Sequence, residues 1–528
     1  MSKTFKSTWL IALSLMLLLT ACSGGNNGSK GNDGKTAVNE NGAKANNGGS
    51  NAGDEGAEQE IVELDVFVNM SWWPLKDWSG KVPEEITKKT GVKLNIQVAA
   101  DDKQLPLLIA SGDLPDLVYT ATDLTRMAAK DVSYPLNELI AKYAPDFEIS
   151  QERIGVNTMP DGNFYTIRNA FSTEQEWKDN PKALPGANGM TLRKDIMEEL
   201  GNPELNNLDD LLSILAMVKE KYPDMVPLVW DKDQIGQNLR IHYGLKKSKG
   251  FVDIDGAARY YLKDENYLDY YLYMNRLYRE GYMLAENFTF KDAQQDDQYV
   301  LNGQAFAHGS GNADSTNPQL EELGASFRMQ QVTKLLSDKA GIPMGGSGWA
   351  GMYITKNNKN PEAAIKFLQY MYSEEGQKLG LYGIEGEDWE WNDAEKYPVM
   401  NYDYNNTEIQ TKMGVVWWGL IGSSGVNEAL QRFNPDSEMT EWALAAREAL
   451  EFNPALGLVS TEPDTEEQTI EAQIQNMVTT EELKIYLAAS EEEAKAQYEA
   501  LLQKAESLGL AKLEEWATTK YKEYQKNF

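Results

Sequence analysis

The chain has 528 residues, of which 81 are acidic and 50 are basic, giving a formal net charge of −31. Such a balance argues against nucleic acid as a partner, because phosphates need a basic footprint, and it is typical of a well-solvated surface. With 41% hydrophobic residues the chain can bury a large core, and with one cysteine it cannot form an intramolecular disulfide.

The N-terminal segment has the pattern of an export signal. Two lysines precede an apolar run from Trp9 to Leu19, which is shorter than the roughly 20 residues of a membrane-spanning helix. The run ends in Leu19-Thr20-Ala21-Cys22, which resembles the bacterial lipobox, where the cysteine is diacylated and becomes the mature N-terminus. An ordinary signal peptide with a chance cysteine is the alternative. We predict a lipoprotein signal peptide over 1–21 and lipidation of Cys22.

The segment after this cysteine is low in complexity. Residues 23–58 consist mainly of Gly, Asn, Ser, Ala and Lys. A stretch with so few large apolar side chains cannot bury enough surface to offset its ordering entropy. We therefore predict a disordered tether over 22–58 and a folded part that starts near Glu60.

The first folded segment alternates strands with helices. Predicted strands cover 61–68, 92–98 and 116–119, and the second of these alternates apolar and polar residues with a period of two. A helix that ends at Gly91 and another at 104–111 separate them. This order predicts a parallel α/β layer. Ligands bind such layers beyond the carboxyl ends of the strands, here at 69–73 and 119–121.

The rest of the chain predicts further strands and an increasingly helical pattern. In chain order we expect a strand at 164–168, a loop at 172–188, residues 191–193 leading into a helix at 194–200, a helix at 208–221, a strand at 226–230, a helix at 264–280, a strand-and-turn region at 327–343, a helix from 361 to 379, and helices at 441–451, 465–476, 481–489 and 491–509.

Several short motifs follow one another in an order that carries a family resemblance. They are Ser111-Gly112-Asp113-Leu114-Pro115-Asp116, Leu192-Arg193-Lys194-Asp195, Leu277-Tyr278-Arg279-Glu280-Gly281, Asn360-Pro361-Glu362-Ala363 and Tyr382-Gly383-Ile384-Glu385-Gly386-Glu387-Asp388-Trp389. Each motif alone is weak, but the ordered set with a lipobox is specific. From Glu60 to the C-terminus the chain resembles extracellular solute-binding protein family 1, the LplA-like lipoproteins that serve ABC sugar importers of Gram-positive bacteria.

The resemblance implies a periplasmic-binding-protein-like α/β fold. Two lobes joined by crossing hinge segments would close on a ligand between them. We expect the first lobe at 59–168 and 346–400, and the second at 169–345 and, mainly helical, at 401–528. The resemblance also implies an oligosaccharide ligand, ABC permease subunits as partners, and a monomer held by its lipid on the outer face of the cell membrane.

No metal or other cofactor is expected. Some alginate-binding relatives carry a calcium loop after the helix equivalent to 208–221, but the segment 221–227 of this chain is too short and has one carboxylate. The turn Asp253-Ile254-Asp255-Gly256 would place Phe251 and Leu262 where a calcium loop requires carboxylates. We predict no calcium site.

Aromatic residues supply most of the candidate ligand contacts. The chain holds 13 Trp and 26 Tyr. Aromatic rings can stack on the C–H faces of sugars while carboxylate or guanidinium groups bind the hydroxyls in a cleft. The candidates are Trp72, Trp73, Asp116, Trp177, Arg193, Trp230, Trp349 and Trp417. For each tryptophan the alternative is core packing, and for Asp116 and Arg193 it is a local structural role.

Two other classes of function stay open at this stage. A secreted glycoside hydrolase or polysaccharide lyase would use a pair of carboxylates, and 81 acidic residues neither exclude nor single out such a pair. Only His242 and His308 are present, which argues against a Ser-His-Asp triad and a His-rich metal hydrolase. A surface adhesion protein would not explain the α/β lobes. We predict a non-enzymatic receptor, with peptides or other polar solutes as alternative ligands.

Overall fold

The computed structural model describes residues 61–528 except 102, 188, 232–233, 291–293, 345, 347, 405, 416–421, 423 and 463. Cys22, the predicted tether and Trp417 lie outside the described residues. Among the helices of the described part, none combines the length and apolarity needed to cross a bilayer.

The first lobe is built on a four-stranded sheet with the order β11-β3-β1-β2. Its strands are β1 (Val62–Val68), β2 (Val92–Val98), β3 (Leu117–Thr120) and β11 (Gly351–Ile354). β1 runs parallel to β2 and β3, whereas β11 runs antiparallel to β3. The chain therefore enters β11 at the same edge of the sheet where β1 and β3 end.

Side chains cover both faces of this sheet, which explains why its strands are so apolar. Leu64 and Val66 of β1 belong to the main core of the lobe, while Phe67 belongs to a smaller core on the opposite face. The helices of the lobe are α1 (Lys81–Thr90), α2 (Gln104–Ser111), α3 (Leu124–Met127), α4 (Leu136–Tyr143), α5 (Gln151–Asn157), α13 (Pro361–Tyr372) and α14 (Glu374–Tyr382). The predictions for β1, β2 and α2 are confirmed.

The second lobe has its own four-stranded sheet, with the order β5-β8-β4-β9. Its strands are β4 (Thr191–Arg193), β5 (Val226–Val229), β8 (Ala305–His308) and β9 (Met329–Gln331). β5 and β8 are parallel, so Val229 and His308 lie side by side where both strands end. The helices α7 (Lys194–Glu199), α8 (Leu208–Lys221), α9 (Gln237–His242), α11 (Gln295–Leu301) and α12 (Ala313–Glu322) lie between these strands in the sequence.

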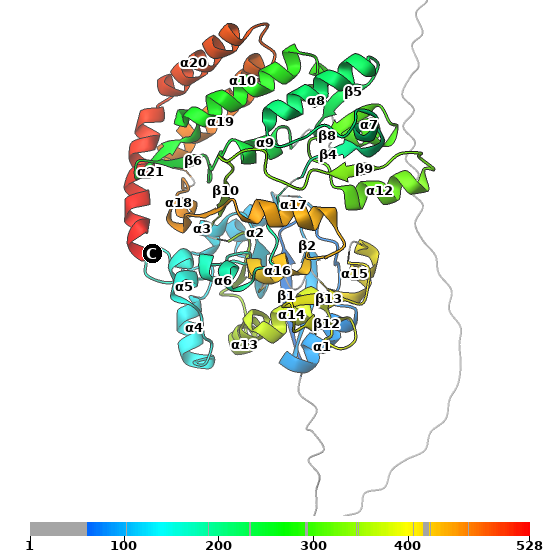
Figure 1. Ribbon diagram of the computed structural model, residues 1–528. Helices are drawn as coiled ribbons and strands as arrows, with labels where there is room; N and C mark the ends of the chain where they lie inside the picture. Colours follow the sequence, from blue (N-terminus) through cyan, green and yellow to red (C-terminus); the bar gives the residue numbers. More distant parts are fainter. Residues whose placement is uncertain are drawn as a thin grey trace, which may run out of the picture. The chain divides into compact units, whose positions relative to one another are not determined.

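The C-terminal helices complete the second core. α19 (Glu466–Tyr486), α20 (Glu491–Ser507) and α21 (Leu510–Tyr524) follow one another, and the first two pack against α10 (Glu265–Arg279), as Figure 1 shows. Tyrosines of α10 meet tyrosines of α19 and α20 in one buried cluster made of Tyr267, Tyr270, Tyr271, Tyr486 and Tyr498. α21 packs on the hairpin β6 (Phe251–Ile254) and β7 (Ala257–Tyr260), whose tight turn was predicted at 253–256.

The remaining elements link the two lobes. They are α6 (Glu174–Asp179), β10 (Ile342–Met344), the hairpin β12 (Trp389–Asn392) and β13 (Tyr397–Met400), α15 (Thr407–Met413), α16 (Gly425–Gln431), α17 (Glu438–Arg447), β14 (Leu450–Phe452) and α18 (Pro454–Leu458). Met413 and Val415 pack in the first core, whereas Trp442 of α17 packs against Ala187 and Ala446. The lobe boundaries given above stay predictions.

The predictions at 164–168 and 172–188 were wrong. Phe164 makes one isolated bridge with Thr158 and the segment is otherwise irregular, partly because the Thr166 hydroxyl donates to a backbone oxygen of β11. The expected loop contains α6. Its start is a capping box, in which the Thr173 hydroxyl accepts from the Glu176 N–H while the Glu176 carboxylate accepts from the Thr173 N–H.

The helix predictions for the last third also need correction. The segment 441–451 holds the end of α17 and then β14, which pairs in parallel with the distant β10. The two helices expected at 465–476 and 481–489 are the single helix α19, and no bounds were predicted for the helix α21. The helix expected from 361 to 379 is broken at Ser373, whose hydroxyl accepts from the Gly376 N–H at 3.1 Å and so starts α14.

Candidate ligand-binding site

Two strand ends of the first lobe are tied together by a buried amide. Asn69 follows β1 directly, and its Nδ2 donates to Thr120 Oγ1 at 3.1 Å and to Thr122 Oγ1 at 3.0 Å, just past β3. The Asn69 backbone N–H also donates to Tyr119 O at 2.9 Å. The loops after β1 and β3 therefore leave the sheet from one fixed edge.

A third segment reaches this edge because β11 runs antiparallel to β3. The Trp349 N–H donates to Asn169 O at 3.0 Å, and Asn169 Oδ1 accepts from the Ala350 N–H at 2.9 Å. Gly348 precedes with φ at +89°, and a Cβ there would lie 2.6 Å from Asn169 O. Only glycine allows this close approach, so the turn sets the position of the Trp349 ring.

These loops present a pair of exposed indole rings, Trp72 and Trp349, which we call the tryptophan pair. Their side chains are 54% and 38% exposed, and their rings stack with centroids 6.0 Å apart and planes 24° apart. Trp73 is fully buried; its ring lies 5.9 Å from Trp72 and edge-on to Tyr119 at 5.6 Å. The structure thus brings three predicted residues together, two of them with faces open to solvent.

Asp116 and Arg193 make bonds within their own lobes. Asp116 Oδ2 accepts from the Asp65 N–H at 3.0 Å, which ties the start of β3 to β1. Arg193 binds Asp195 through two hydrogen bonds of 2.8 and 2.6 Å and lies 3.7 Å over the Phe327 ring. Burial tends to raise the pKa of Asp195, but the hydrogen bond and charge of Arg193 outweigh it and lower that pKa. Both side chains have structural partners.

Trp177 and Trp230 are packed in the interior. Trp177 is 4% exposed and its Nε1 donates to Ser172 Oγ at 2.9 Å. Trp230 is fully buried, and its backbone N–H and C=O both bond the Asn287 side chain, at 2.9 and 2.7 Å. Its ring lies so close to Gly309 that a Cβ there would be 1.9 Å away. Neither ring presents a face to solvent in this conformation.

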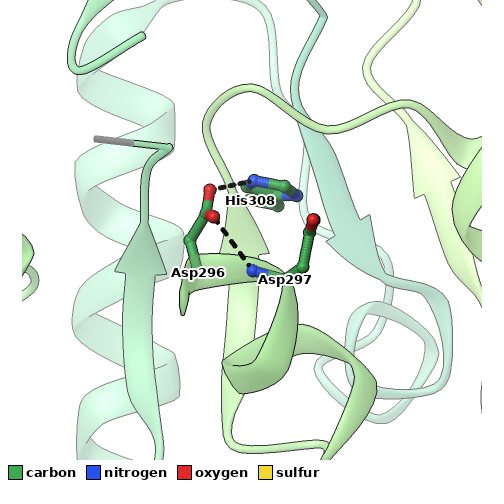
Figure 2. A group of neighbouring side chains, drawn as sticks. All are labelled: Asp296, Asp297 and His308. Atoms are coloured by element: carbon green, nitrogen blue, oxygen red, sulfur yellow. Dashed lines mark hydrogen bonds and ion pairs between the residues drawn. The ribbon is translucent and has the colours of Figure 1, made fainter. Parts of the chain in front are cut away.

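Sequence reasoning missed a polar group at the carboxyl end of β8. Figure 2 shows His308 between Asp296 and Asp297 of α11, with His308 Nε2 2.6 Å from Asp296 Oδ2. One ligand atom from each of the three lies within 4.8 Å of the others. Burial raises the pKa of Asp297, the charges of Asp296 and Asp231 add to this, and His308 opposes it. No sequence motif predicts this group, because it forms only when α11 packs against β8 in the folded chain.

Two cavities lie elsewhere on the second lobe. One of about 590 Å³ has Tyr243 and Tyr273 in its wall, and another of about 500 Å³ lies beside β6, β10 and β14. None of the described candidate residues lines either cavity. The candidate site therefore rests on the exposed rings and the strand ends.

Two α/β lobes with aromatic faces exposed at strand carboxyl ends have the architecture of a solute receptor. A family model for bacterial extracellular solute-binding proteins matches residues 72–378, which is more than half of the chain. The chain belongs to this family, as its motifs predicted. The family is a class of non-enzymatic transport components, so the hydrolase and lyase alternatives are set aside.

Curated relatives are similar over part of their length. The chain is 25% identical over 338 residues to the fructooligosaccharide ABC transporter substrate-binding protein FusA of Streptococcus pneumoniae serotype 4, covering 58% of this chain and 60% of FusA. It is 23% identical over 342 residues to lipoprotein LipO of Bacillus subtilis, covering 58% of this chain and 64% of LipO. The chain thus spans less than two thirds of either relative.

Solved structures establish the fold over a longer stretch. The S. pneumoniae FusA structure in complex with kestose matches with a TM-score of 0.65 at 18% identity, covering 88% of this chain and 100% of that one. An HMO-binding solute-binding protein of Bifidobacterium longum infantis matches with a TM-score of 0.64 at 15% identity, covering 87% and 98%. The predicted periplasmic solute-binding fold is confirmed.

Proposed function

We propose that this chain is the extracellular receptor of an ABC importer for a carbohydrate. It binds an oligosaccharide through the tryptophan pair and delivers it to membrane permease subunits. The observation that carries the proposal is the exposure of two stacked indoles at the edge where β1 and β3 end. Large apolar rings are normally buried. Exposed rings at the carboxyl ends of the strands, where ligands bind such sheets, therefore indicate a ligand-binding surface.

The geometry of the tryptophan pair favours a sugar that stacks on the outer faces of the two indole rings. Ring centroids 6.0 Å apart leave no room for a sugar ring between the indoles, so a ligand would stack on their outer faces. Indole faces match the C–H faces of pyranose and furanose rings, and polar groups at the rim would bind the hydroxyls. Relatives named for fructooligosaccharide and for HMO binding support this class of ligand.

The remaining candidates serve the proposal in different ways. Trp73 would support Trp72 from beneath, since it is buried against Tyr119. Asp116, Arg193, Trp177 and Trp230 would reach a ligand only after rearrangement, because each has partners in its own lobe. Trp417 stays a candidate from the sequence alone.

A glycan panel tests the proposal. The domain from residue 59 onward is titrated with fructooligosaccharides, milk oligosaccharides and N-glycans, with short peptides as the alternative class, and intrinsic tryptophan fluorescence is recorded. We expect a saturable change for one glycan class at micromolar concentration and no product by mass spectrometry. Saturable binding of peptides alone would overturn the carbohydrate proposal, and turnover of a glycan would revive the hydrolase alternative.

The lipid anchor belongs to the same proposal. The lipobox at Cys22 and the similarity to lipoprotein LipO support attachment to the outer face of the membrane. Full-length protein with Cys22→Ser should then move from the membrane fraction to the medium, while Ser23→Ala, next to it, should not. Retention of the Cys22→Ser protein in the membrane fraction would contradict the anchor.

A further inference from the structure

The three-residue group at the end of the second sheet has no part in the function proposed above. Asp296 and His308 are 1% and 5% exposed, and Asp297 lies on the more open side of the group. We propose that His308 and Asp297 bind a divalent transition-metal ion such as Zn²⁺, with Asp296 holding the imidazole in place.

The first step concerns the imidazole. His308 Nε2 lies 2.6 Å from Asp296 Oδ2, and a carboxylate accepts, so Nε2 carries the proton and donates it. In the neutral imidazole, Nδ1 then carries an unprotonated lone pair. It is buried and has no hydrogen-bond partner among the residues that the structure describes. A buried acceptor without a partner is unfavourable, and a metal ion would supply that partner. A carboxylate behind a ligating histidine is a recurrent support of zinc sites.

The second step concerns the facing carboxylate. Figure 2 shows the Asp297 side chain on the opposite side of the imidazole from Asp296. The ligand atoms of the group lie within 4.8 Å of one another. Two atoms that share a zinc ion at about 2.0–2.2 Å lie no more than about 4.3 Å apart. Rotation of the Asp297 side chain toward His308 Nδ1 would close the site.

Carboxylates lie close together around His308. Asp296 and Asp297 bring two carboxylates to His308, and the Asp231 N–H donates to Ser310 Oγ at 3.1 Å, which places the Asp231 backbone beside the end of β8. Carboxylates gathered in a partly buried place repel one another, and a divalent cation removes that repulsion.

The donor set decides between metals. Imidazole nitrogen with carboxylate oxygen suits zinc and its neighbours, whereas Ca²⁺ takes six to eight oxygen ligands. This group differs from the calcium loop that the sequence excluded at 221–227 and 253–256, because it uses a histidine and joins the helix α11 to the end of the strand β8.

Calorimetric titration of the untagged domain with Zn²⁺ tests the proposal, with Ca²⁺ and Mg²⁺ as comparisons. We expect one Zn²⁺ site that Asp297→Asn and His308→Gln each weaken at least tenfold. Glutamine keeps an N–H for Asp296 but removes Nδ1. Asp296→Asn should weaken Zn²⁺ binding by about 10- to 100-fold, as loss of a histidine-orienting carboxylate does.

The only other histidine provides a matched control. In His242, Nε2 is paired with Asn238 Oδ1 at 3.1 Å and Nδ1 accepts from the Leu336 N–H at 3.2 Å, so neither nitrogen is available. His242→Asn should leave Zn²⁺ affinity unchanged, and thermal unfolding checks that each variant is folded. Equal Zn²⁺ affinity in the wild type, Asp297→Asn and His308→Gln would overturn the proposal. If His308→Gln does not fold, the Asp297→Asn result decides.

Discussion

Neighbouring residues of one type have opposite environments in this molecule. Trp72 and Trp73 follow β1 together, yet one is 54% exposed and the other fully buried. The sequence placed both residues just past the end of β1 but could not predict which ring is buried. That depends on two tertiary contacts, of Trp73 with Tyr119 and of Trp72 with Trp349, which precedes β11. At the residue scale, the proposed ligand contact depends on which ring faces outward.

Trp72→Ala and Trp349→Ala are each expected to weaken ligand binding by more than about 1 kcal/mol, or about fivefold in Kd, because an aromatic face is lost. Fluorescence or calorimetric titration with the ligand from the glycan panel measures the change. Trp391→Ala is the control, since this ring is partly exposed on the hairpin β12–β13 beneath Lys378. An equal loss of affinity in the control would contradict a specific role for the pair.

Because His242 is buried, we expect the folded state to lose stability in acid. Burial lowers the pKa of His242 to about 4, whereas the unfolded chain binds this proton at the ordinary value of 6.5. Below 6.5 the unfolded state therefore binds more protons than the folded state, and stability falls as the pH drops from 6.5 toward 4. A shift of this size corresponds to about 3 kcal/mol. His242→Asn should show a smaller difference between denaturation curves at pH 7 and pH 4.5 than the wild type. An identical difference would contradict this assignment.

At the scale of elements, one buried carboxylate of the C-terminal helix α21 binds this helix to the strand β7. Glu514 is 4% exposed, and it accepts from the Tyr260 N–H at 2.9 Å and from Arg259 at 3.3 Å. The bond joins α21 to β7, the inner strand of the hairpin that α21 covers. The helix α21, for which the sequence predicted no bounds, is therefore attached through a polar contact as well as through Leu513 and Ala517.

Glu514→Ala should lower the free energy of unfolding by about 2–4 kcal/mol, because it leaves the buried Tyr260 N–H without an acceptor. Glu514→Gln should cost less, since its amide oxygen can still accept from that N–H. Urea denaturation measures both, and the exposed neighbour Glu515→Ala is the control. Equal stability of the Ala and Gln variants would show that the hydrogen bond to Tyr260 contributes little.

How well each element was predicted follows the range of the interactions that form it. β1, β2 and the end of α1 were predicted closely because strand periodicity and Gly91, the glycine after α1, are local signals. β14 was missed because its strand form depends on β10, far away in the sequence. The same reason applies to the sites: the parallel-sheet rule placed Trp72 and Trp73 correctly at an edge, whereas the meeting of Asp296 and His308 requires the tertiary contact of α11 with β8.

At the scale of the whole molecule, the chain passes repeatedly between its two cores. It does so between Ile167 and Met190, between Val332 and Ala350, and between Val415 and Ala455. Two of these crossings pair as β10 and β14, where the Ile342 N–H donates to Ala449 O at 2.7 Å. Several connections restrict two lobes to rotation about the segments that join them, which is how hinge closure operates.

If the receptor closes on its ligand, the domain should become more compact when the glycan binds. Small-angle scattering of the folded domain should show a smaller radius of gyration at a ligand concentration of about 100 times Kd, where binding also stabilises the folded state by about 2.7 kcal/mol. The double variant Trp72→Ala and Trp349→Ala is the control, because two additive losses of about fivefold should raise by about 25-fold the ligand concentration that produces the same decrease in radius. An unchanged radius in the wild type, with saturation verified by fluorescence, would mean that the ligand binds to the tryptophan pair without closure of the second lobe.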